Sequence, residues 1–256
     1  MKYKIVDTMI NVELDGELKQ IYEKFGSTEE IKELNISLVQ YPECHYGVDV
    51  LDIHGMSHCL RQRKSILAVD EKWENSIIYG DTDFDNSTLI EMQLYSYLLS
   101  RGSLLIHSSL VDYDGNGIMF IGPSGIGKTT QAELWHQYQN ADILNGDLVF
   151  VRKREDGFYG YGSPWHGSSP YYENKKVKLK ALVMLEQGIE NKIQKIDGFE
   201  RLKRMMDQTF MPYWQNNLMD TAFQTIDQLL TEIPMYFLSC RPDEGSVRLV
   251  KEKLKL

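Results

Sequence analysis

The chain has 256 residues, with 28 Lys or Arg against 37 Asp or Glu, and a net charge of −9. Its hydrophobic fraction of 42% is enough for the core of one large domain, or of one domain with a smaller one attached. The negative charge argues against a broad surface for nucleic acid or anionic membrane, because phosphate groups would be repelled. It leaves room for a local phosphate-binding pocket.

The cysteines are too few and too irregularly spaced for the disulfide framework of a secreted protein. No apolar run approaches the roughly 20 residues that span a bilayer, and the N-terminus lacks the apolar segment of a signal peptide. We therefore expect a cytoplasmic protein. A zinc site is a weak alternative for one cluster, because it contains no closely spaced Cys pair; its members are Cys44, His45, His54, His58 and Cys59.

The first 85 residues predict a small α+β region that could recognise a substrate. Alternation predicts a strand at residues 2–13, and apolar spacing predicts a helix at residues 16–25. Further strands are expected at residues 36–39, 48–53 and 65–69. The polar, turn-rich residues 81–86 then indicate a boundary between domains 1–85 and 86–256.

The second region mixes helices with strands. A helix is expected at residues 87–100, followed by strands at 104–111 and 118–121 that a turn joins into a hairpin. The remaining expected elements are a helix at 128–138, strands at 141–144, 148–151, 179–185 and 235–239, two helices within 198–231, and a helix at 245–254. This order predicts an α/β domain with some antiparallel pairing.

One motif in this region carries specific chemistry. Residues 122–129 read Gly-Pro-Ser-Gly-Ile-Gly-Lys-Thr, which fits the phosphate-loop pattern G-x4-G-K-[ST] at every defined position. The glycines let backbone N–H groups face anionic oxygens, Lys128 adds a positive charge, and the Thr129 hydroxyl can reach Mg²⁺. The predicted nucleotide-binding residues are Gly122, Pro123, Ser124, Gly125, Ile126, Gly127, Lys128, Thr129 and Thr130.

The motif also has the flanks that it needs. An apolar strand precedes it and an amphipathic helix follows. An ordinary glycine-rich turn between the two, with no phosphate-binding role, is the less favoured alternative. A GTPase is disfavoured, because two Asn-Lys sequences lack the Asp that would complete a base-reading motif: Val177 and Gln194 stand in its place.

The surroundings of the motif resemble a known family. Residues 106–111 read Ile-His-Ser-Ser-Leu-Val, and residues 141–147 read Ala-Asp-Ile-Leu-Asn-Gly-Asp. With the motif between them, this order resembles the catalytic domain of HPr kinase/phosphorylase and the HPr-kinase-like proteins, over roughly residues 104–185. The resemblance implies an α/β fold, with the mixed-sheet P-loop core that HPr kinases share with phosphoenolpyruvate carboxykinases, and implies ATP and Mg²⁺ as cofactors.

The resemblance also implies roles for single residues. Asp147 matches the second of two adjacent acids and would hold Mg²⁺ with Thr129. Gly146 stands where the family has the first acid, the implied general base, so the base is left open. His107 matches a family histidine and suits proton transfer near neutral pH. His166 could contact phosphate or replace the base, or it could belong to an ordinary packed loop.

The sequence thus predicts an ATP-dependent kinase that transfers the γ-phosphoryl group to a serine-like hydroxyl on a peptide, a protein or a small molecule. Its expected catalytic residues are His107, Lys128, Asp147 and His166. A nucleotide-binding sensor or scaffold is the alternative, and a carboxykinase is less favoured because the chain is short. An oligomer is possible, while nucleic-acid and membrane partners are not expected.

Overall fold

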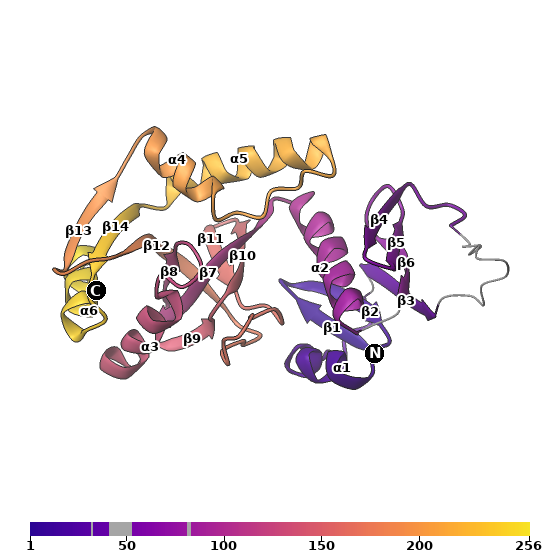
Figure 1. Ribbon diagram of the computed structural model, residues 1–256, viewed down its shortest axis with the longest axis horizontal. Helices are drawn as coiled ribbons and strands as arrows, with labels where there is room; N and C mark the ends of the chain where they lie inside the picture. The colour runs from indigo at the N-terminus through magenta and orange to yellow at the C-terminus, as the bar shows by residue number, and fades with distance from the viewer. Residues whose placement is uncertain (32, 41–52, 81–82) are drawn as a thin grey trace. The chain divides into compact units, whose positions relative to one another are not determined.

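The computed structural model describes residues 1–31, 33–40, 53–80 and 83–256. It divides into two compact units, Met1–Arg101 and Gly102–Leu256 (Figure 1). Each unit has its own sheet, so the expected α/β class is confirmed and each unit is described by itself. Most of the expected strand at residues 48–53, together with Cys44 and His45, lies outside the described residues.

Unit 1 is built on a six-stranded mixed sheet in the order β1-β2-β3-β6-β5-β4. Its strands are β1 (Lys2–Ile5), β2 (Thr8–Val12), β3 (Leu34–Gln40), β4 (His58–Gln62), β5 (Ser65–Val69) and β6 (Asn75–Gly80). The single strand expected at residues 2–13 is wrong: β1 and β2 pair antiparallel across a turn at Val6 and Asp7, whose φ angles are 52° and 57°. A β-branched valine rarely adopts such a turn, which is why the sequence conceals it.

Helix α2 (Asp83–Leu99) belongs to unit 1, together with α1 (Gly16–Tyr22) and the short 3-10 helix η1 (Glu23–Phe25). It packs on β3, β4, β5, β6 and α1, and buries Leu89, Leu94 and Leu98. The two units therefore divide after Arg101, whereas the polar residues 81–86 favoured a boundary near residue 85. Packing of the helix, rather than local composition, determines where the unit ends.

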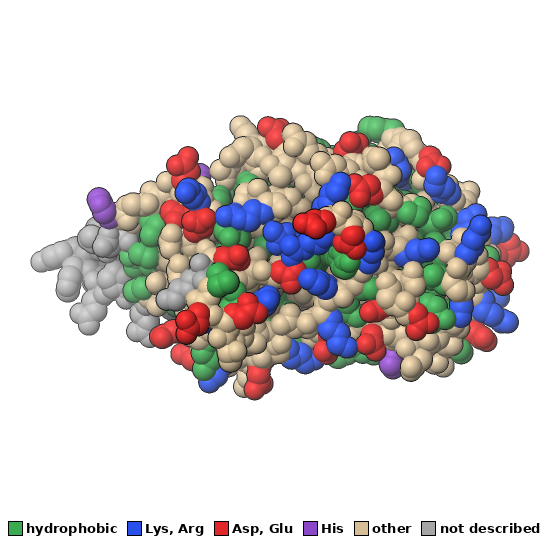
Figure 2. All heavy atoms as spheres, turned by 180° about the vertical axis from the view of Figure 1, so that it is seen from behind, with side chains coloured by type: hydrophobic (Ala, Val, Ile, Leu, Met, Phe, Trp, Pro, Cys, Tyr) green, Lys and Arg blue, Asp and Glu red, His purple; other side chains and the backbone are tan. Residues whose placement is uncertain are grey.

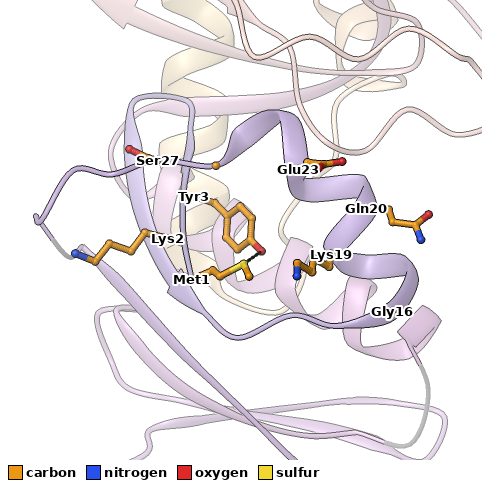
Figure 3. A pocket seen from close by; sticks show the side chains of 9 residues that line it. Met1, Lys2, Tyr3, Gly16, Lys19, Gln20, Glu23 and Ser27 are labelled. Atoms are coloured by element: carbon orange, nitrogen blue, oxygen red, sulfur yellow. Dashed lines mark hydrogen bonds between the residues drawn. The ribbon is translucent and has the colours of Figure 1, made fainter.

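A hollow of about 800 Å³ lies in unit 1 beside the start of β1 and helix α1 (Figure 3). Figure 3 shows the Tyr3 ring beside Met1, and the Tyr3 hydroxyl donates a 3.6 Å hydrogen bond to the Met1 sulfur. Lys2, Lys19 and Glu23 also line the hollow, so its wall carries charges of both signs.

Unit 2 is built on an eight-stranded mixed sheet in the order β11-β10-β7-β8-β12-β14-β13, with β9 paired to β7. The strands are β7 (Ser103–Tyr113), β8 (Asn116–Ile121), β9 (Asp142–Asn145), β10 (Leu148–Arg154), β11 (Gly157–Tyr161), β12 (Lys176–Gln187), β13 (Lys192–Ile196) and β14 (Met235–Cys240). The expected hairpin is confirmed, since β7 and β8 pair antiparallel. Strands β8, β12 and β14 run parallel, so their carboxyl ends meet at one edge.

Four helices complete unit 2: α3 (Lys128–Gln139), α4 (Phe199–Met206), α5 (Asn216–Glu232) and α6 (Glu244–Leu254). Helices α3 and α6 pack together, and α3 buries Ala132 and Trp135 against Phe120 and Ile118 of β8. Helix α5 packs on β7 and β11. Burial of Trp135 therefore anchors α3, and with it the 122–129 loop at its start, to the sheet.

The surface seen in Figure 2 carries acidic and basic side chains that are interspersed with one another. Within the part of the chain that the structure describes, none of the helices has the length and apolar character needed to cross a membrane.

Candidate active site

The 122–129 loop connects β8 to α3, as the sequence predicted. Gly125 and Gly127 have φ angles of 76° and 111°, in the region that favours glycine, and Gly127 is the residue that precedes the first turn of α3. The backbone N–H of Ile126 closes a tight turn by donating to the carbonyl of Pro123 at 3.3 Å. The loop therefore takes its shape from its glycines, immediately before the positive end of a helix.

Lys128 is buried inside this loop, with 6% of its surface exposed. Its ammonium donates to the carbonyl oxygens of Gly122 and Pro123 at 3.1 and 3.3 Å. Burial lowers the pKa of Lys128, and the negative charge of Asp147 partly opposes that effect. An anion bound in the loop would favour the charged ammonium further, so this position suits a phosphate.

Two hydroxyl groups join the start of α3 to β7 and to the residues between β9 and β10. Thr129 Oγ1 donates to the carbonyl of Gly146 at 3.1 Å, and Ser109 Oγ of β7 donates to the carbonyl of Lys128 at 2.8 Å. The Thr129 hydroxyl is consequently bonded to Gly146, the residue that precedes Asp147 in the chain. The structure brings together the two oxygen donors that the sequence proposed for Mg²⁺.

His107 and Asp147 form a hydrogen-bonded pair, with 3.0 Å between His107 Nε2 and Asp147 Oδ1. The register of β7 against β10 produces this contact, because it places His107 opposite Leu148. The hydrogen bond from His107 is the main cause that lowers the pKa of Asp147, and the charges of Lys128 and His166 act in the same direction. Asp147 is therefore ionised at neutral pH and suited to hold a cation.

The position of the absent first acid is filled by another side chain. A Cβ atom on Gly146 would lie 1.9 Å from Ser169 Oγ and 2.5 Å from Ser169 Cβ, and Ser169 is 92% buried, since only 8% of it is exposed. A backbone hydrogen bond also fixes the segment that contains Ser169 against Gly146, because Gly146 N–H donates to the carbonyl of Tyr171 at 3.1 Å. There is no space for a carboxylate at residue 146 in this arrangement.

The segment 162–173 brings His166 to the site. Its ring is hydrogen-bonded through Nδ1 to the carbonyl of Ser169 and stacks on Tyr172, with 4.2 Å between the ring centroids. Gly167, with φ of 56°, packs so closely that a Cβ atom there would lie 2.4 Å from Asp147 Oδ2. The segment thus packs closely against Oδ2 of Asp147, whereas His107 contacts Oδ1.

Sequence reasoning missed the residue that attaches this segment to the sheet. Asn145 is fully buried, and its amide donates to the carbonyls of Ser163 and Trp165 at 3.0 and 3.2 Å. Its side-chain oxygen accepts from the backbone N–H groups of Asp147 and Leu148 at 2.8 and 2.9 Å. The available signal was an asparagine that follows two apolar residues, Ile143 and Leu144, at the end of β9 and immediately before Gly146.

A second missed feature is an isolated bridge that Thr209 makes to β7, just after α4. Ile106 and Thr209 form an antiparallel bridge, and the backbone N–H of His107 donates to the carbonyl of Gln208 at 2.9 Å. The backbone N–H of Phe210 in turn donates to the carbonyl of Leu105 at 3.0 Å, so this piece of chain runs beside His107 on β7. Phe210 is 42% exposed, so an aromatic surface lies near the pair.

The zinc hypothesis gains no support. Within the described ranges, no group of three or more His, Cys, Asp or Glu side chains is arranged to hold a metal ion. His58 instead stacks on Trp73, with 5.2 Å between ring centroids, and Cys59 is exposed.

Comparison with known proteins agrees with the resemblance seen in the sequence. The chain is 23% identical over 123 residues to an HPr kinase/phosphorylase of Mycoplasmopsis pulmonis, a match that covers 48% of this chain and 37% of that protein. It thus spans little more than a third of the length of this relative. A solved structure, the Hpr(Ser) kinase/phosphatase from Coxiella burnetii, aligns with a TM-score of 0.34 and 10% identity, over 59% of this chain and 99% of that one.

A family match covers more of the chain than the curated relative does. The family described as SynChlorMet cassette protein ScmC matches residues 86–245, which include the 122–129 loop, His107, Asp147 and the 162–173 segment. This is more than half of the chain. The chain therefore belongs to the SynChlorMet cassette protein ScmC family.

Proposed function

We propose that this protein is an ATP-dependent kinase that transfers the γ-phosphoryl group of ATP to a hydroxyl. The observation that carries the proposal is the convergence of Lys128, Thr129, Asp147 and His107 at one site of unit 2. Phosphoryl transfer needs mainly positioning and neutralisation of charge, and these groups can supply both. Similarity to an HPr kinase/phosphorylase supports this reaction class and a P-loop core of the kind shared with phosphoenolpyruvate carboxykinases.

The residues present fit ATP with Mg²⁺. Lys128 and the backbone of the loop would bind the phosphates, and Thr129 with Asp147 offers Mg²⁺ two oxygen donors held by adjacent elements. Mg²⁺ prefers such ligands and keeps several waters, so two protein donors and the phosphates suffice. The chemistry supplied by the metal is neutralisation of charge on the β- and γ-phosphate oxygens.

His107 is the proposed base. Since its Nε2 donates to Asp147 Oδ1, the neutral ring presents Nδ1 as the nitrogen that can take a proton. The acceptor hydroxyl gives its proton to this nitrogen while its oxygen forms a bond to the γ-phosphorus. The bond between that phosphorus and the bridging oxygen breaks, and ADP leaves. Asp147 orients the ring and stabilises its charged form.

The acceptor is a hydroxyl-bearing peptide, protein or small molecule. The relative is named for the protein HPr, which makes a protein or peptide acceptor the first class to test. Unit 1 is the candidate for its recognition, and the charged hollow in Figure 3 is where a segment of such an acceptor could bind. We place the reaction in the cytoplasm, which supplies ATP and Mg²⁺.

A nucleotide-binding sensor is the second candidate, and Gly146 favours it. The resemblance to HPr kinases implies an acid at this position, and here Ser169 occupies the space. A protein without an effective base would bind ATP with Mg²⁺ and transfer little.

Incubation with γ-labelled ATP separates the two candidates. We expect label to appear on a serine-containing peptide, a hydroxy amino acid or the product of a neighbouring gene, as identified by mass spectrometry. Lys128→Ala should abolish the transfer while the circular dichroism spectrum stays unchanged, because it removes the ammonium from the loop but leaves α3 packed on the sheet through Ala132 and Trp135. Binding of ATP without labelled product from any acceptor would favour the sensor.

A further inference from the structure

A hollow of about 450 Å³ lies beside the 122–129 loop, and no role has been assigned to it so far. We propose that it binds the nucleoside of the nucleotide whose phosphates occupy the loop. This inference rests on the proposed function, because it takes the loop as the phosphate site. It extends the nucleotide site to the ends of β12 and β14, which the sequence motif does not include.

The position of the hollow supports this assignment. Gly125, Gly127 and Thr130 form one wall, so the phosphate loop and the hollow share a surface. Leu185 at the end of β12 and Cys240 at the end of β14 form another. Because β8, β12 and β14 run parallel, the hollow lies at their carboxyl ends, which is where open α/β sheets bind ligands.

The lining of the hollow suits a planar, uncharged ring. Ile126, Leu185 and Pro242 contribute apolar surface. Gln131 also lines the hollow, and its Nε2 already donates to Cys240 Sγ and Ser246 Oγ at 3.3 and 3.0 Å. The buried polar groups of the floor are therefore satisfied by one another, and a base can cover them without leaving them unpaired.

The thiol of Cys240 adds no negative charge to this floor. Burial is the largest cause that raises the pKa of Cys240, to about 11, so the group is neutral at physiological pH. Glu186 also lines the hollow and is its acidic residue, so a neutral thiol avoids adding a second negative charge beside the triphosphate in a protein of net charge −9.

Gln187 spans the mouth of the hollow. This exposed side chain at the end of β12 donates from Nε2 to the carbonyl of Gly125 at 3.4 Å, a long and therefore weak hydrogen bond. A side-chain amide both donates and accepts hydrogen bonds, so Gln187 can exchange this bond for one to the base or the ribose. The hollow thus combines apolar walls with a few polar side chains, among them Gln187 and Glu186, as small-molecule sites do.

Hydrogen exchange on the wild-type protein tests the assignment with two ligands, ATP and inorganic tripolyphosphate, each with Mg²⁺. Both should slow exchange of amides in residues 122–130. ATP alone should also slow exchange in residues 185–188 and 240–242. Equal protection of all these amides by the two ligands would overturn the proposal. If neither ligand protected residues 122–130, the phosphate site itself would fail, and the proposed function with it.

A substitution provides the second test. Cys240→Phe adds a ring that projects into the hollow, and it should weaken ATP binding at least tenfold in titration calorimetry, while tripolyphosphate affinity stays within twofold. Cys59→Phe places the same ring at an exposed cysteine of unit 1 and should change neither affinity. Equal losses for ATP and tripolyphosphate in folded Cys240→Phe would contradict a nucleoside site.

Discussion

Gly146 and Ser169 explain at the scale of single residues why one acid of the expected pair is absent. Ser169 comes within 1.9 Å of the place where a Cβ atom of residue 146 would stand, so the two positions cannot both carry their side chains unchanged. The site can therefore hold glycine at residue 146 with serine at residue 169, as here, or an acid at residue 146 with a smaller residue at 169.

This relationship predicts an outcome for attempts to restore the acid. Gly146→Asp should destabilise the protein by about 1–3 kcal/mol, because the added side chain overpacks a buried site. Ser169→Gly in the same chain should recover most of that loss. Thermal unfolding of the two single variants and the double variant measures the coupling. Additive effects in the double variant would show that the two side chains do not compete for the same space.

Asp147 predicts a specific dependence of stability on pH. Its pKa lies below the ordinary value of 3.8 in the folded protein, chiefly because of the His107 hydrogen bond. The unfolded chain therefore binds its proton first as the pH falls. The ionised carboxylate contributes its full stabilisation of the folded protein at pH values above the ordinary pKa of 3.8. This contribution is lost as the pH falls through the lowered pKa of the folded protein.

The measurement is urea unfolding of wild type and Asp147→Asn between pH 5 and pH 3, with EDTA present. The difference between their free energies of unfolding should shrink on acidification, because only the wild type has this carboxylate to protonate. A difference that stays constant over this range would show that the pKa of Asp147 is not lowered by folding.

At the residue scale the sequence named residues that the structure brings together, but it did not give their contacts. Lys128 and Thr129 were predicted because their motif is contiguous, and a local loop suffices to place them. His107 and Asp147 were candidates as well, but their hydrogen bond depends on the register of β7 against β10. Ser169 was not predicted, since nothing local indicates that it fills the space at Gly146.

At the scale of elements, the 162–173 segment depends on strand β9 (Asp142–Asn145) for its position. Asn145 makes the connection, since its buried amide joins the carbonyls of Ser163 and Trp165 to the backbone at Asp147. The segment carries His166 and Gly167, so one asparagine supports the surroundings of Asp147.

We predict that Asn145→Ala lowers the free energy of unfolding by about 3 kcal/mol, because it leaves several buried backbone groups without partners. Nucleotide-dependent activity should fall with it, since Asp147 loses its backbone support. Asn116→Ala is the matched control: it removes two bonds from the turn between β7 and β8 and should cost less than about 1 kcal/mol. Chemical denaturation measures both values, and equal losses would contradict the role of Asn145.

The elements that the sequence predicted well are those with strong local signals. The β7–β8 hairpin has a turn rich in Asp, Gly and Asn, and α3 has a glycine loop before it and buried residues at helical spacing. Strands β4, β6, β11 and β13 were not predicted, because they are short and contain several polar residues or, in β11, two glycines. Their pairing partners, rather than their own residues, make them strands.

At the scale of the whole molecule, the excess of acidic residues has a consequence for the site. ATP is an anion, and a chain of net charge −9 repels it on average. Binding must therefore depend on local groups, of which Lys128 is the buried cation and Asp147 a nearby anion. A carboxylate beside a phosphate site is unfavourable unless it holds a cation there.

This argument predicts that Asp147→Asn changes ATP affinity in opposite directions with and without Mg²⁺. In EDTA the variant should bind ATP more tightly than wild type, by up to about tenfold, because one negative charge near Lys128 is removed. With Mg²⁺ it should bind more weakly, because the metal loses a ligand. Asp142→Asn removes an exposed carboxylate that pairs with Lys175, and it should leave both affinities unchanged. Titration calorimetry measures all four cases. Weaker binding by Asp147→Asn in both conditions would show that Asp147 supports the shape of the site rather than a cation.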